Sequence, residues 1–244
     1  MSKLIVITGC SSGIGHQLCV DFLKDADNIV VGIDIQQPTI ENDSFIFYKC
    51  DLANLTKTHF TAKSIEMQFG SVDVLINNAG KLDNYQSLLD VDYSDMYESI
   101  MVNLFSHMTL TKSLLPGMVE ERKGCIVNVT SVASTETGGG GASYTSAKHG
   151  LLGFTKQLAV EVAEYGIRVN SVSPGAIRTP MTENDFSEES NMLWQDVQKT
   201  IPLDRWGTVE EVSNAVKFLT GDQNTYMQGH NLVIDGGWSI NHSM

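Results

Sequence analysis

The stretch LIVITGCSSGIG at residues 4–15 decides the fold of this chain. Its opening run, LIVIT, is apolar or β-branched without alternation, which is typical of a parallel strand covered by helices on both faces. Glycines at positions 9, 13 and 15 then mark a sharp turn into a helix that the apolar spacing predicts over 13–23. A buried strand that leads through such a turn into a helix is the first unit of an α/β protein.

Short apolar runs alternate with helical stretches along the rest of the chain. The sequence predicts strands at 29–33, 45–50, 72–76, 125–130, 167–173 and 231–234. It predicts helices at 55–69, 144–165 and 209–219, and one or two helices within 92–118 that end near Pro116. This alternation, joined by right-handed crossovers, predicts a doubly wound parallel sheet, or Rossmann fold, of about seven strands with helices on both faces.

The chain shows no sign of a domain boundary. No linker rich in proline, glycine or serine divides it, so we expect a single domain over 1–244. The segment 181–200 is polar, acidic and weakly periodic, and such long irregular segments are commonly lids, so we expect it to cover a substrate. We expect specificity there and in loops 81–97 and 132–143. The glycines at 138–141 predict room for a bulky or flexible substrate.

The charge balance excludes several classes of partner. With 16 Lys and Arg against 29 Asp and Glu, the 244-residue chain has a formal net charge of −13. Nucleic acids and anionic membranes bind through Lys and Arg that neutralise phosphate, so we expect neither partner. No apolar run is long enough to span a membrane or form a signal peptide, and we expect a cytoplasmic protein.

The cysteine and histidine spacings indicate no metal centre. Cysteines stand at 10, 19, 50 and 125 without a C-x-x-C pair, so we expect free thiols in a reducing compartment. None of the six histidines has the spacing of a metal-ligand motif. We therefore expect a protein without a bound metal.

The glycine-rich turn suits a phosphate ligand, since open parallel sheets bind ligands beyond the carboxyl ends of their strands. Gly9 lets the chain turn out of the strand, while Gly13 and Gly15 let the helix approach a pyrophosphate and the sheet. The helix start offers unpaired N–H groups and a positive dipole end, and Ser11 and Ser12 add hydroxyl donors. A plain strand-to-helix loop is the alternative, because the spacing is G-x-x-x-G-x-G rather than G-x-G-x-x-G.

Asp34 stands at the end of the second predicted strand, about twenty residues after the turn. A carboxylate there can accept both hydroxyls of an adenosine ribose, and it repels a 2′-phosphate. At about 4 Å and an effective dielectric near 20, that repulsion costs roughly 4 kcal/mol. No Arg or Lys lies in the turn or at 35–48 to offset it, so the sequence predicts NAD rather than NADP. A solvated Asp at a strand end is the alternative.

The motif YTSAK places Tyr144 and Lys148 four residues apart at the start of a predicted helix, where both lie on one face. A tyrosine has a reference pKa near 10 and is a poor base at neutral pH. A neighbouring ammonium stabilises the phenolate. Moving the pKa to about 7 requires roughly 4 kcal/mol, which we expect Lys148 and a nicotinamide cation to supply together. The spacing alone is common by chance.

The motifs of this chain, taken in order, resemble those of the short-chain dehydrogenase/reductase family in its shorter single-domain form. The resemblance extends over nearly the whole length. The matching motifs are TGCSSGIG at 8–15, Asp34, CDL at 50–52, NNAG at 77–80, Asn103, Ser131, YTSAK at 144–148, PG at 174–175 and DGG at 235–237. Each match alone is weak, while the ordered set is specific.

This resemblance implies a role for each matched residue. Tyr144 exchanges a proton with the substrate oxygen, and Ser131 orients that oxygen. Lys148 lowers the pKa of Tyr144 and binds the nicotinamide ribose, while Asn103 holds a water that links Lys148 to solvent. The turn, Asp34 and the resemblance together predict cofactor contacts at Gly9, Ser11, Ser12, Gly13, Ile14, Gly15, Asp34, Ile35, Asp51, Leu52, Asn78, Ala79, Gly80, Tyr144, Lys148, Pro174, Gly175, Ile177 and Thr179.

The resemblance implies an NAD-dependent oxidoreductase that interconverts a secondary alcohol and a ketone, with a small polar hydroxy-compound, sugar or polyol as substrate. A 3-oxoacyl-[acyl-carrier-protein] reductase is the alternative, although Asp34 and the net charge of −13 oppose its usual NADPH preference and its acidic carrier. A non-catalytic NAD-binding regulator is a third hypothesis, which the complete catalytic set disfavours. Members of the family usually assemble as homotetramers, which we expect here.

Overall fold

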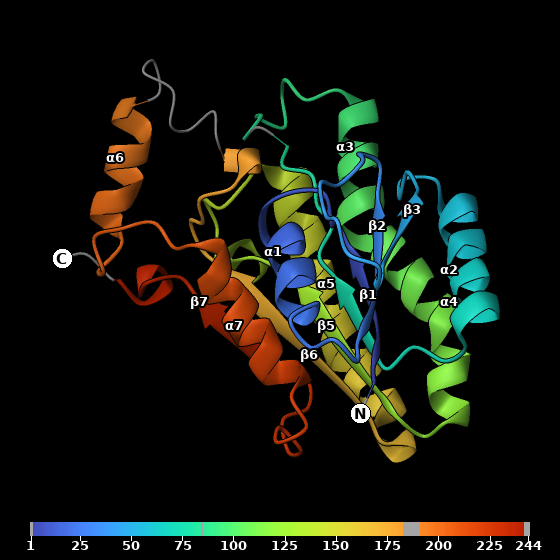
Figure 1. Cartoon of the computed structure of the whole chain (residues 1–244). Helices are drawn as coiled ribbons and strands as arrows, with labels where there is room; N and C mark the ends of the chain where they lie inside the picture. The colour runs from blue at the N-terminus through green and yellow to red at the C-terminus, as the bar shows by residue number, and fades with distance from the viewer. Residues whose placement is uncertain (1, 84, 183–190, 242–244) are drawn as a thin grey trace.

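The computed structural model describes residues 2–83, 85–182 and 191–241, with only the backbone of 191–195. Within these residues, seven strands form one sheet (Figure 1). The strands in spatial order are β3 (Phe45–Lys49), β2 (Ile29–Asp34), β1 (Leu4–Thr8), β4 (Val74–Asn77), β5 (Gly124–Val129), β6 (Ile167–Pro174) and β7 (Asn231–Ile234). Every neighbouring pair is parallel, which confirms the predicted doubly wound fold. The order reverses between β1 and β4, where such sheets open a crevice.

Helices cover both faces of this sheet (Figure 1). The helices on one face are α1 (Gly13–Phe22) and α7 (Val209–Thr220), and those on the other are α2 (Leu55–Phe69), α4 (Ser106–Glu120) and α5 (Ala142–Val162). Ile5 and Ile7 of β1 belong to the apolar core under α1 and α7, whereas Leu4 and Val6 belong to the core under the other three helices. Strand β1 is therefore buried on both faces, as its unbroken apolar run predicts.

The region 92–118 departs from the prediction. It contains α3 (Tyr93–Ile100), a π-helical turn (Met101–Phe105) and most of α4 (Ser106–Glu120). Helix α4 continues through Pro116 instead of ending there. A proline inside a helix removes one hydrogen bond. Leu114 and Met118 on either side of it are fully buried against the sheet, and their burial keeps the helix intact.

The segment 181–200 differs from the predicted irregular structure in its second half. Its second half forms α6 (Asn191–Thr200), whereas 183–190 lie outside the described residues. On this helix Lys199 pairs with Asp196 at 2.9 Å, one turn apart, and both side chains are exposed. A surface helix needs only a narrow apolar stripe, so the polar composition of 181–200 is compatible with a helix.

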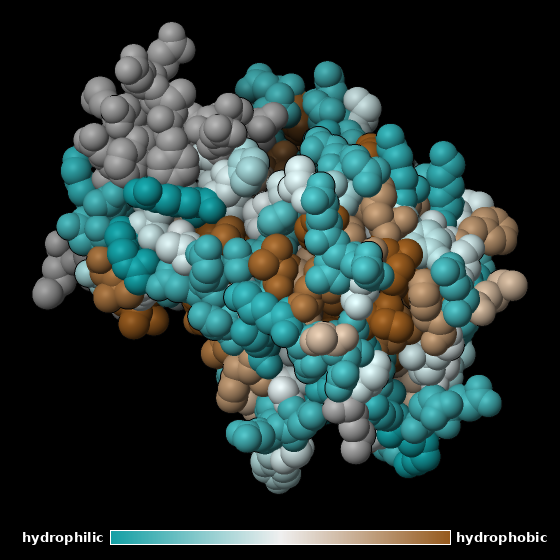
Figure 2. Space-filling view, viewed as in Figure 1, coloured by the Kyte–Doolittle hydropathy of each residue, from teal (hydrophilic) through white to brown (hydrophobic). Residues whose placement is uncertain are grey.

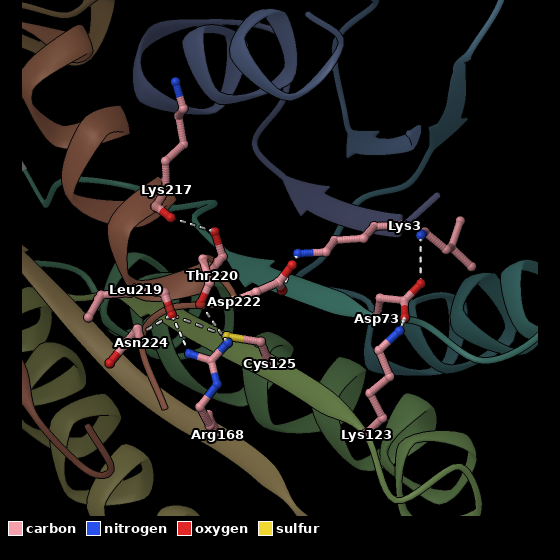
Figure 3. Close-up of polar contacts among 12 residues, drawn as sticks. Lys3, Asp73, Lys123, Cys125, Arg168, Lys217, Leu219, Thr220, Asp222 and Asn224 are labelled. Atoms are coloured by element: carbon pink, nitrogen blue, oxygen red, sulfur yellow. Dashed lines mark hydrogen bonds and ion pairs between the residues drawn. The ribbon is translucent and has the colours of Figure 1, made fainter. Parts of the chain in front are cut away.

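The amino ends of the strands are joined to the end of α7 by polar contacts (Figure 3). Arg168, near the start of β6, donates to the carbonyl oxygens of Leu219 and Gly221 at 2.5 and 3.3 Å. Lys3, just before β1, pairs with Asp222 at 2.7 Å. These contacts satisfy carbonyls at the end of α7 and hold it to the amino ends of the strands. The glycine-rich turn lies at the opposite, carboxyl ends of the strands.

One face of the molecule shows a largely polar surface. On the face shown in Figure 2, hydrophilic residues surround smaller apolar patches. No helix in the described part of the chain is long and apolar enough to cross a membrane. The outer faces of the helices therefore meet water, while the apolar residues of the strands lie inside.

The cysteines are placed for packing rather than for reaction. All four are buried free thiols. Burial raises the pKa of Cys10 to about 12 and that of Cys125 to about 11. Because the thiolate is the nucleophile and the metal ligand, both reactions are disfavoured at these positions. Across the residues described above, no group of three or more His, Cys, Asp or Glu side chains could hold a metal ion.

Candidate active site

A cavity of about 980 Å³ opens at the carboxyl ends of the strands, and most of the expected site residues line it. Those residues are Gly9, Ser11, Ser12, Gly13, Ile14, Asp34, Ile35, Asp51, Leu52, Asn78, Ala79, Gly80, Ser131, Tyr144, Lys148, Pro174, Gly175, Ile177 and Thr179. Gly15 and Asn103 are the expected residues outside this lining. They contact residues of the wall instead.

The glycine-rich turn has the geometry that the sequence predicts. Gly9 and Gly13 have φ angles of 71° and 53°, a left-handed conformation that side chains disfavour. A Cβ on Gly15 would lie 1.9 Å from the carbonyl oxygen of Gly9, so only glycine lets α1 begin this close to β1. The hydroxyl of Thr8 accepts from two backbone N–H groups of the NNAG segment, both at 2.9 Å. These bonds join the turn to the end of β4.

The start of α1 fits a phosphate group. Its N-cap residue, Ser12, makes no side-chain capping bond, and the first turn holds no acidic residue. The first N–H groups of the helix therefore have no acceptor within it, and the helix dipole favours an anion there. These features suit the pyrophosphate of a dinucleotide cofactor.

Asp34 is fixed at the end of β2 with its side chain on the cavity wall. One carboxylate oxygen accepts from the backbone N–H of Ser11 at 2.9 Å, and the other accepts from that of Gln36 at 3.0 Å. The Ser11 hydroxyl donates in turn to the carbonyl oxygen of Gln36 at 2.5 Å. Each carboxylate oxygen keeps further lone pairs, which could accept the hydroxyls of a ribose.

Tyr144 and Lys148 lie in the first turns of α5, and both are buried. The Nζ of Lys148 donates to the carbonyl oxygen of Val129 at 3.0 Å and lies 5.6 Å from the centroid of the Tyr144 ring. Ser131 follows β5 and caps a short 3₁₀ turn, where its hydroxyl accepts from the backbone N–H of Ala133 at 3.2 Å. The structure thus places Ser131, Tyr144 and Lys148 on the wall of one cavity.

Burial controls the protonation of Tyr144 and Lys148. It raises the pKa of Tyr144 to about 12, although the Ser131 hydroxyl opposes this shift. It lowers the pKa of Lys148 to about 7. Both shifts favour the uncharged form, because a buried charge loses its hydration. The sequence predicts that the Lys148 ammonium lowers the pKa of Tyr144, whereas in the protein alone burial is the largest influence and raises it.

Asn103 lies in the π-helical turn and is fully buried. Its side-chain amide donates to the carbonyl oxygens of Lys81 and Ser99 at 2.8 and 2.9 Å, and its Oδ1 accepts from the N–H of Lys81 at 3.2 Å. A Cβ on Gly80 would lie 3.0 Å from that Oδ1 and 3.7 Å from the Nζ of Lys148. Asn103 therefore holds the segment after β4 close to Lys148. A water between Asn103 and Lys148 stays a prediction.

The structure adds wall residues that the motifs did not indicate. Trp206 and Trp238 line the cavity, and the only sequence signal is that Trp238 directly follows the DGG motif. Tyr85 also lines it and belongs to the 81–97 loop, to which the sequence assigns specificity. Asp83 in the same loop is buried and bonded to the start of α5, and no motif marks it.

The glycines at 138–141 leave the cavity less bare than the sequence predicts. Only the first two of them line it. A Cβ on Gly140 would lie 2.4 Å from a carbon of the Tyr144 ring, and a Cβ on Gly141 would lie 2.7 Å from the carboxylate of Asp83. The second two glycines therefore make room for protein side chains rather than for a substrate.

Comparison with known proteins identifies the family. A family model described as enoyl-(acyl carrier protein) reductase matches residues 9–239. Short-chain dehydrogenase reductase 3b of Arabidopsis thaliana is 34% identical over 249 residues, which cover 98% of this chain and 96% of the relative. The chain belongs to the short-chain dehydrogenase/reductase family, as its ordered motifs predict.

Relatives with more specific names cover the chain equally well. The 2-(R)-hydroxypropyl-CoM dehydrogenase of Xanthobacter autotrophicus is 34% identical over 98% of this chain and 99% of its own length. The 3-oxoacyl-[acyl-carrier-protein] reductase of Thermotoga maritima is 32% identical over 98% of each chain. These relatives are dehydrogenases and reductases, and the family assignment makes this chain an oxidoreductase.

Solved structures of the same fold include complexes with both nicotinamide cofactors. The ligand-free aldohexose dehydrogenase of Thermoplasma acidophilum matches with a TM-score of 0.91 and 28% identity, over 100% of this chain and 96% of that one. A 4-hydroxyisoleucine dehydrogenase complexed with NADH matches at 0.84 and 32%, over 98% and 99%. ElxO with NADP bound matches at 0.88 and 29%, over 98% and 100%. Similarity alone therefore leaves the cofactor open.

The buried Lys148 predicts a pH dependence of stability. Its pKa falls from 10.5 in the unfolded chain to about 7 in the folded protein, so the unfolded chain binds more protons between these values. The stability contributed by the neutral amine is complete above 10.5 and is lost as the pH falls through 7. We expect Lys148→Met to remove this dependence. Its stability relative to the parent should be greater at pH 6 than at pH 10 by up to about 4 kcal/mol in urea unfolding.

The comparison between two pH values cancels the constant cost of losing the bond to Val129. A stability difference between Lys148→Met and the parent that stays the same across this range would contradict the buried, neutral state of Lys148.

Proposed function

We propose that this chain is an NAD-dependent dehydrogenase or reductase that transfers a hydride between NAD(H) and a secondary alcohol or ketone. The observation that carries the proposal is the burial of Tyr144 and Lys148 beside Ser131 on the wall of one cavity. The glycine-rich turn and Asp34 lie on the same wall. A regulator that only bound NAD would have no need of a buried tyrosine and lysine at this place.

In this proposal Tyr144 carries the proton and Ser131 orients the substrate oxygen. The bound cofactor supplies or accepts the hydride at the substrate carbon. During reduction Tyr144 gives its hydroxyl proton to the carbonyl oxygen as the carbon gains the hydride, and its raised pKa keeps that proton in place at neutral pH. During oxidation Tyr144 accepts the proton of the alcohol. Positive charge at Lys148 and at the oxidised nicotinamide stabilises the phenolate that this step requires.

The electrostatics at Asp34 support NAD as the cofactor. Its carboxylate is held by the N–H groups of Ser11 and Gln36 and lies on the cavity wall, so it stays in place to face the adenosine ribose. A phosphate on that ribose would meet a fixed negative charge. The same carboxylate can accept hydrogen bonds from two ribose hydroxyls.

For the substrate we propose a small polar hydroxy-compound, sugar or polyol. The similarity to an aldohexose dehydrogenase and to a 2-(R)-hydroxypropyl-CoM dehydrogenase supports this class. A 3-oxoacyl-[acyl-carrier-protein] reductase is the second candidate, which the Thermotoga maritima relative favours. The net charge of −13 opposes it, because an acidic carrier protein docks best on a basic face.

We further propose a cytoplasmic homotetramer in which α6 and Met181 cover the substrate. Met181 and Val197 line the cavity, which supports the covering role. Helices α4 and α5 are the expected contact between subunits. Phe105, immediately before α4, and Val160 on α5 are apolar side chains with exposed fractions of 42% and 77%, as expected of a surface that pairs with a second copy.

Tyr144→Phe tests the proposed reaction. The variant keeps the ring but loses the proton, so we expect turnover to fall about 10²–10⁴-fold while NADH still binds with nearly the same affinity. The assay uses NAD(H) with glucose, sorbitol, acetoin, butane-2,3-dione and a 3-oxobutyryl thioester, followed by nicotinamide absorbance. Tyr226→Phe is the matched control, because the Tyr226 side chain is fully exposed. If Tyr144→Phe keeps the turnover of the unaltered protein, Tyr144 is not the acid and base of the reaction.

Asp34→Ala tests the choice of cofactor. Removing the carboxylate should raise kcat/KM with NADP relative to NAD by tenfold or more, since even half of the estimated repulsion of roughly 4 kcal/mol exceeds one decade. Asp43→Ala is the control, because it removes an exposed negative charge just before β3, at the other end of the sheet from Asp34, that does not line the cavity. Equal use of both cofactors by the unaltered protein would refute the role of Asp34.

Light scattering tests the assembly. We expect a mass of about four times the 26.7 kDa chain, because exposed apolar side chains beside α4 and on α5 are buried when subunits pair. Val160→Glu places a charge in that contact and is expected to lower the mass. A monomeric mass for the unaltered protein would contradict the homotetramer.

A further inference from the structure

Asp83 makes an unusual set of contacts for a residue in a loop after a strand. Its side chain is only 7% exposed. Its Oδ1 accepts from the backbone N–H of Gly141 at 2.7 Å, and its Oδ2 accepts from the backbone N–H of Tyr144 at 2.9 Å and from the hydroxyl of Ser143 at 2.8 Å. Both oxygens are therefore directed at the first turn of α5.

Helix α5 depends on this carboxylate because it has no cap of its own. Its N-cap residue, Gly141, makes no side-chain capping bond, and its first turn contains no acidic residue. Asp83 supplies from a separate loop what an Asp at the N-cap supplies within a helix, namely an acceptor for free N–H groups and a negative charge at the dipole end. Burial alone would raise the pKa of Asp83, but hydrogen bonds from Tyr144, Gly141 and Ser143 outweigh it and lower the pKa, so the group is charged.

The loop before α5 is shaped to receive Asp83. Gly141 has a φ of −75°, which any residue can adopt, so its backbone does not require glycine. A Cβ at this position would lie 2.7 Å from Oδ2 of Asp83 and 2.9 Å from Oδ1. The reason for a glycine here is therefore the carboxylate itself. Tyr144 follows three residues after Gly141, and its backbone N–H donates to the same carboxylate.

We propose that Asp83 is a positioning residue, which fixes the backbone of Tyr144 and so sets where the reactive hydroxyl lies on the cavity wall. This inference rests on the proposed function, in which Tyr144 carries the proton. Asp83 touches neither substrate nor cofactor in this role. It acts through the first turn of α5, which contains Tyr144. Lys148 lies one turn further along the same helix.

Asp83→Asn is the first test, because it keeps the size of the side chain but replaces one acceptor oxygen by a donor. The probe is the compound that the unaltered enzyme turns over fastest in the alcohol and ketone panel. We expect kcat to fall about 10–100-fold, since a small displacement of a reacting group has effects of this size, while KM for NADH changes less than about threefold. Asp92→Asn is the matched control, because Asp92 is exposed and caps α3 without a side-chain bond.

Gly141→Ala is a second and independent test, because it keeps the charge of Asp83 and only obstructs its approach. We expect this variant to lower kcat about as much as Asp83→Asn does. In an Asp83→Ala background the obstruction is gone, so Gly141→Ala should cause no further loss of kcat. Equal losses from Gly141→Ala in both backgrounds would show that the glycine serves another purpose, and the inference would be overturned.

The remaining outcomes are also decisive. A loss of NADH binding that matches the loss of kcat in Asp83→Asn would make the role of Asp83 structural and would overturn the inference. An unchanged kcat in Asp83→Asn would do the same. Inactivity of Tyr144→Phe together with full activity of Asp83→Asn defeats only this inference, whereas activity of Tyr144→Phe defeats the proposed function first.

Discussion

The close approach of α1 to the end of β1 is the constraint on which the rest of the site depends. A Cβ on Gly15 would lie 1.9 Å from the carbonyl oxygen of Gly9. The helix can therefore begin this close to the end of β1 only because residue 15 has no Cβ. The turn then presents the N–H of Ser11 to Asp34 and is held to β4 through Thr8. The proposed positions of the cofactor phosphate and ribose are thereby fixed relative to one another and to the cavity.

The end of the cavity that Tyr144 and Lys148 line carries a second constraint, which is electrostatic. Tyr144 and Lys148 are both buried, and in the protein alone each is driven toward its uncharged form. The folded state thus holds a lysine that loses much of its charge near neutral pH, which lowers stability and fits the trade-off expected at a functional site. A cation bound nearby would reverse the balance at the tyrosine. The protein alone therefore favours Tyr144 as a proton donor, and in the proposed reaction its conversion to a base depends on positive charge at Lys148 and at a bound cofactor.

The sequence was sufficient for features that depend on short-range pattern. The unbroken run in β1 and the ordered motifs predicted the parallel sheet and half of the residues that line the cavity, since each depends on nearby residues. It was misleading where tertiary packing decided. Pro116 is a helix breaker, yet Leu114 and Met118 are buried around it and α4 continues. The role of Asp83 could not be predicted, because its partners lie about sixty positions away and no spacing rule connects a loop to a distant helix start.

The same distant contacts change the interpretation of the loop after β4. Lys81 is bonded through its backbone to Asn103, and Asp83 is bonded to the start of α5, so the beginning of this loop is attached to two elements that carry the proposed catalytic side chains. A segment tied in this way cannot adapt freely to different substrates. Recognition must therefore depend on the wall residues outside it. Among the described residues these include the aromatic side chains of Trp206 and Trp238, whose flat faces suit the apolar edges of the proposed small hydroxylated substrate.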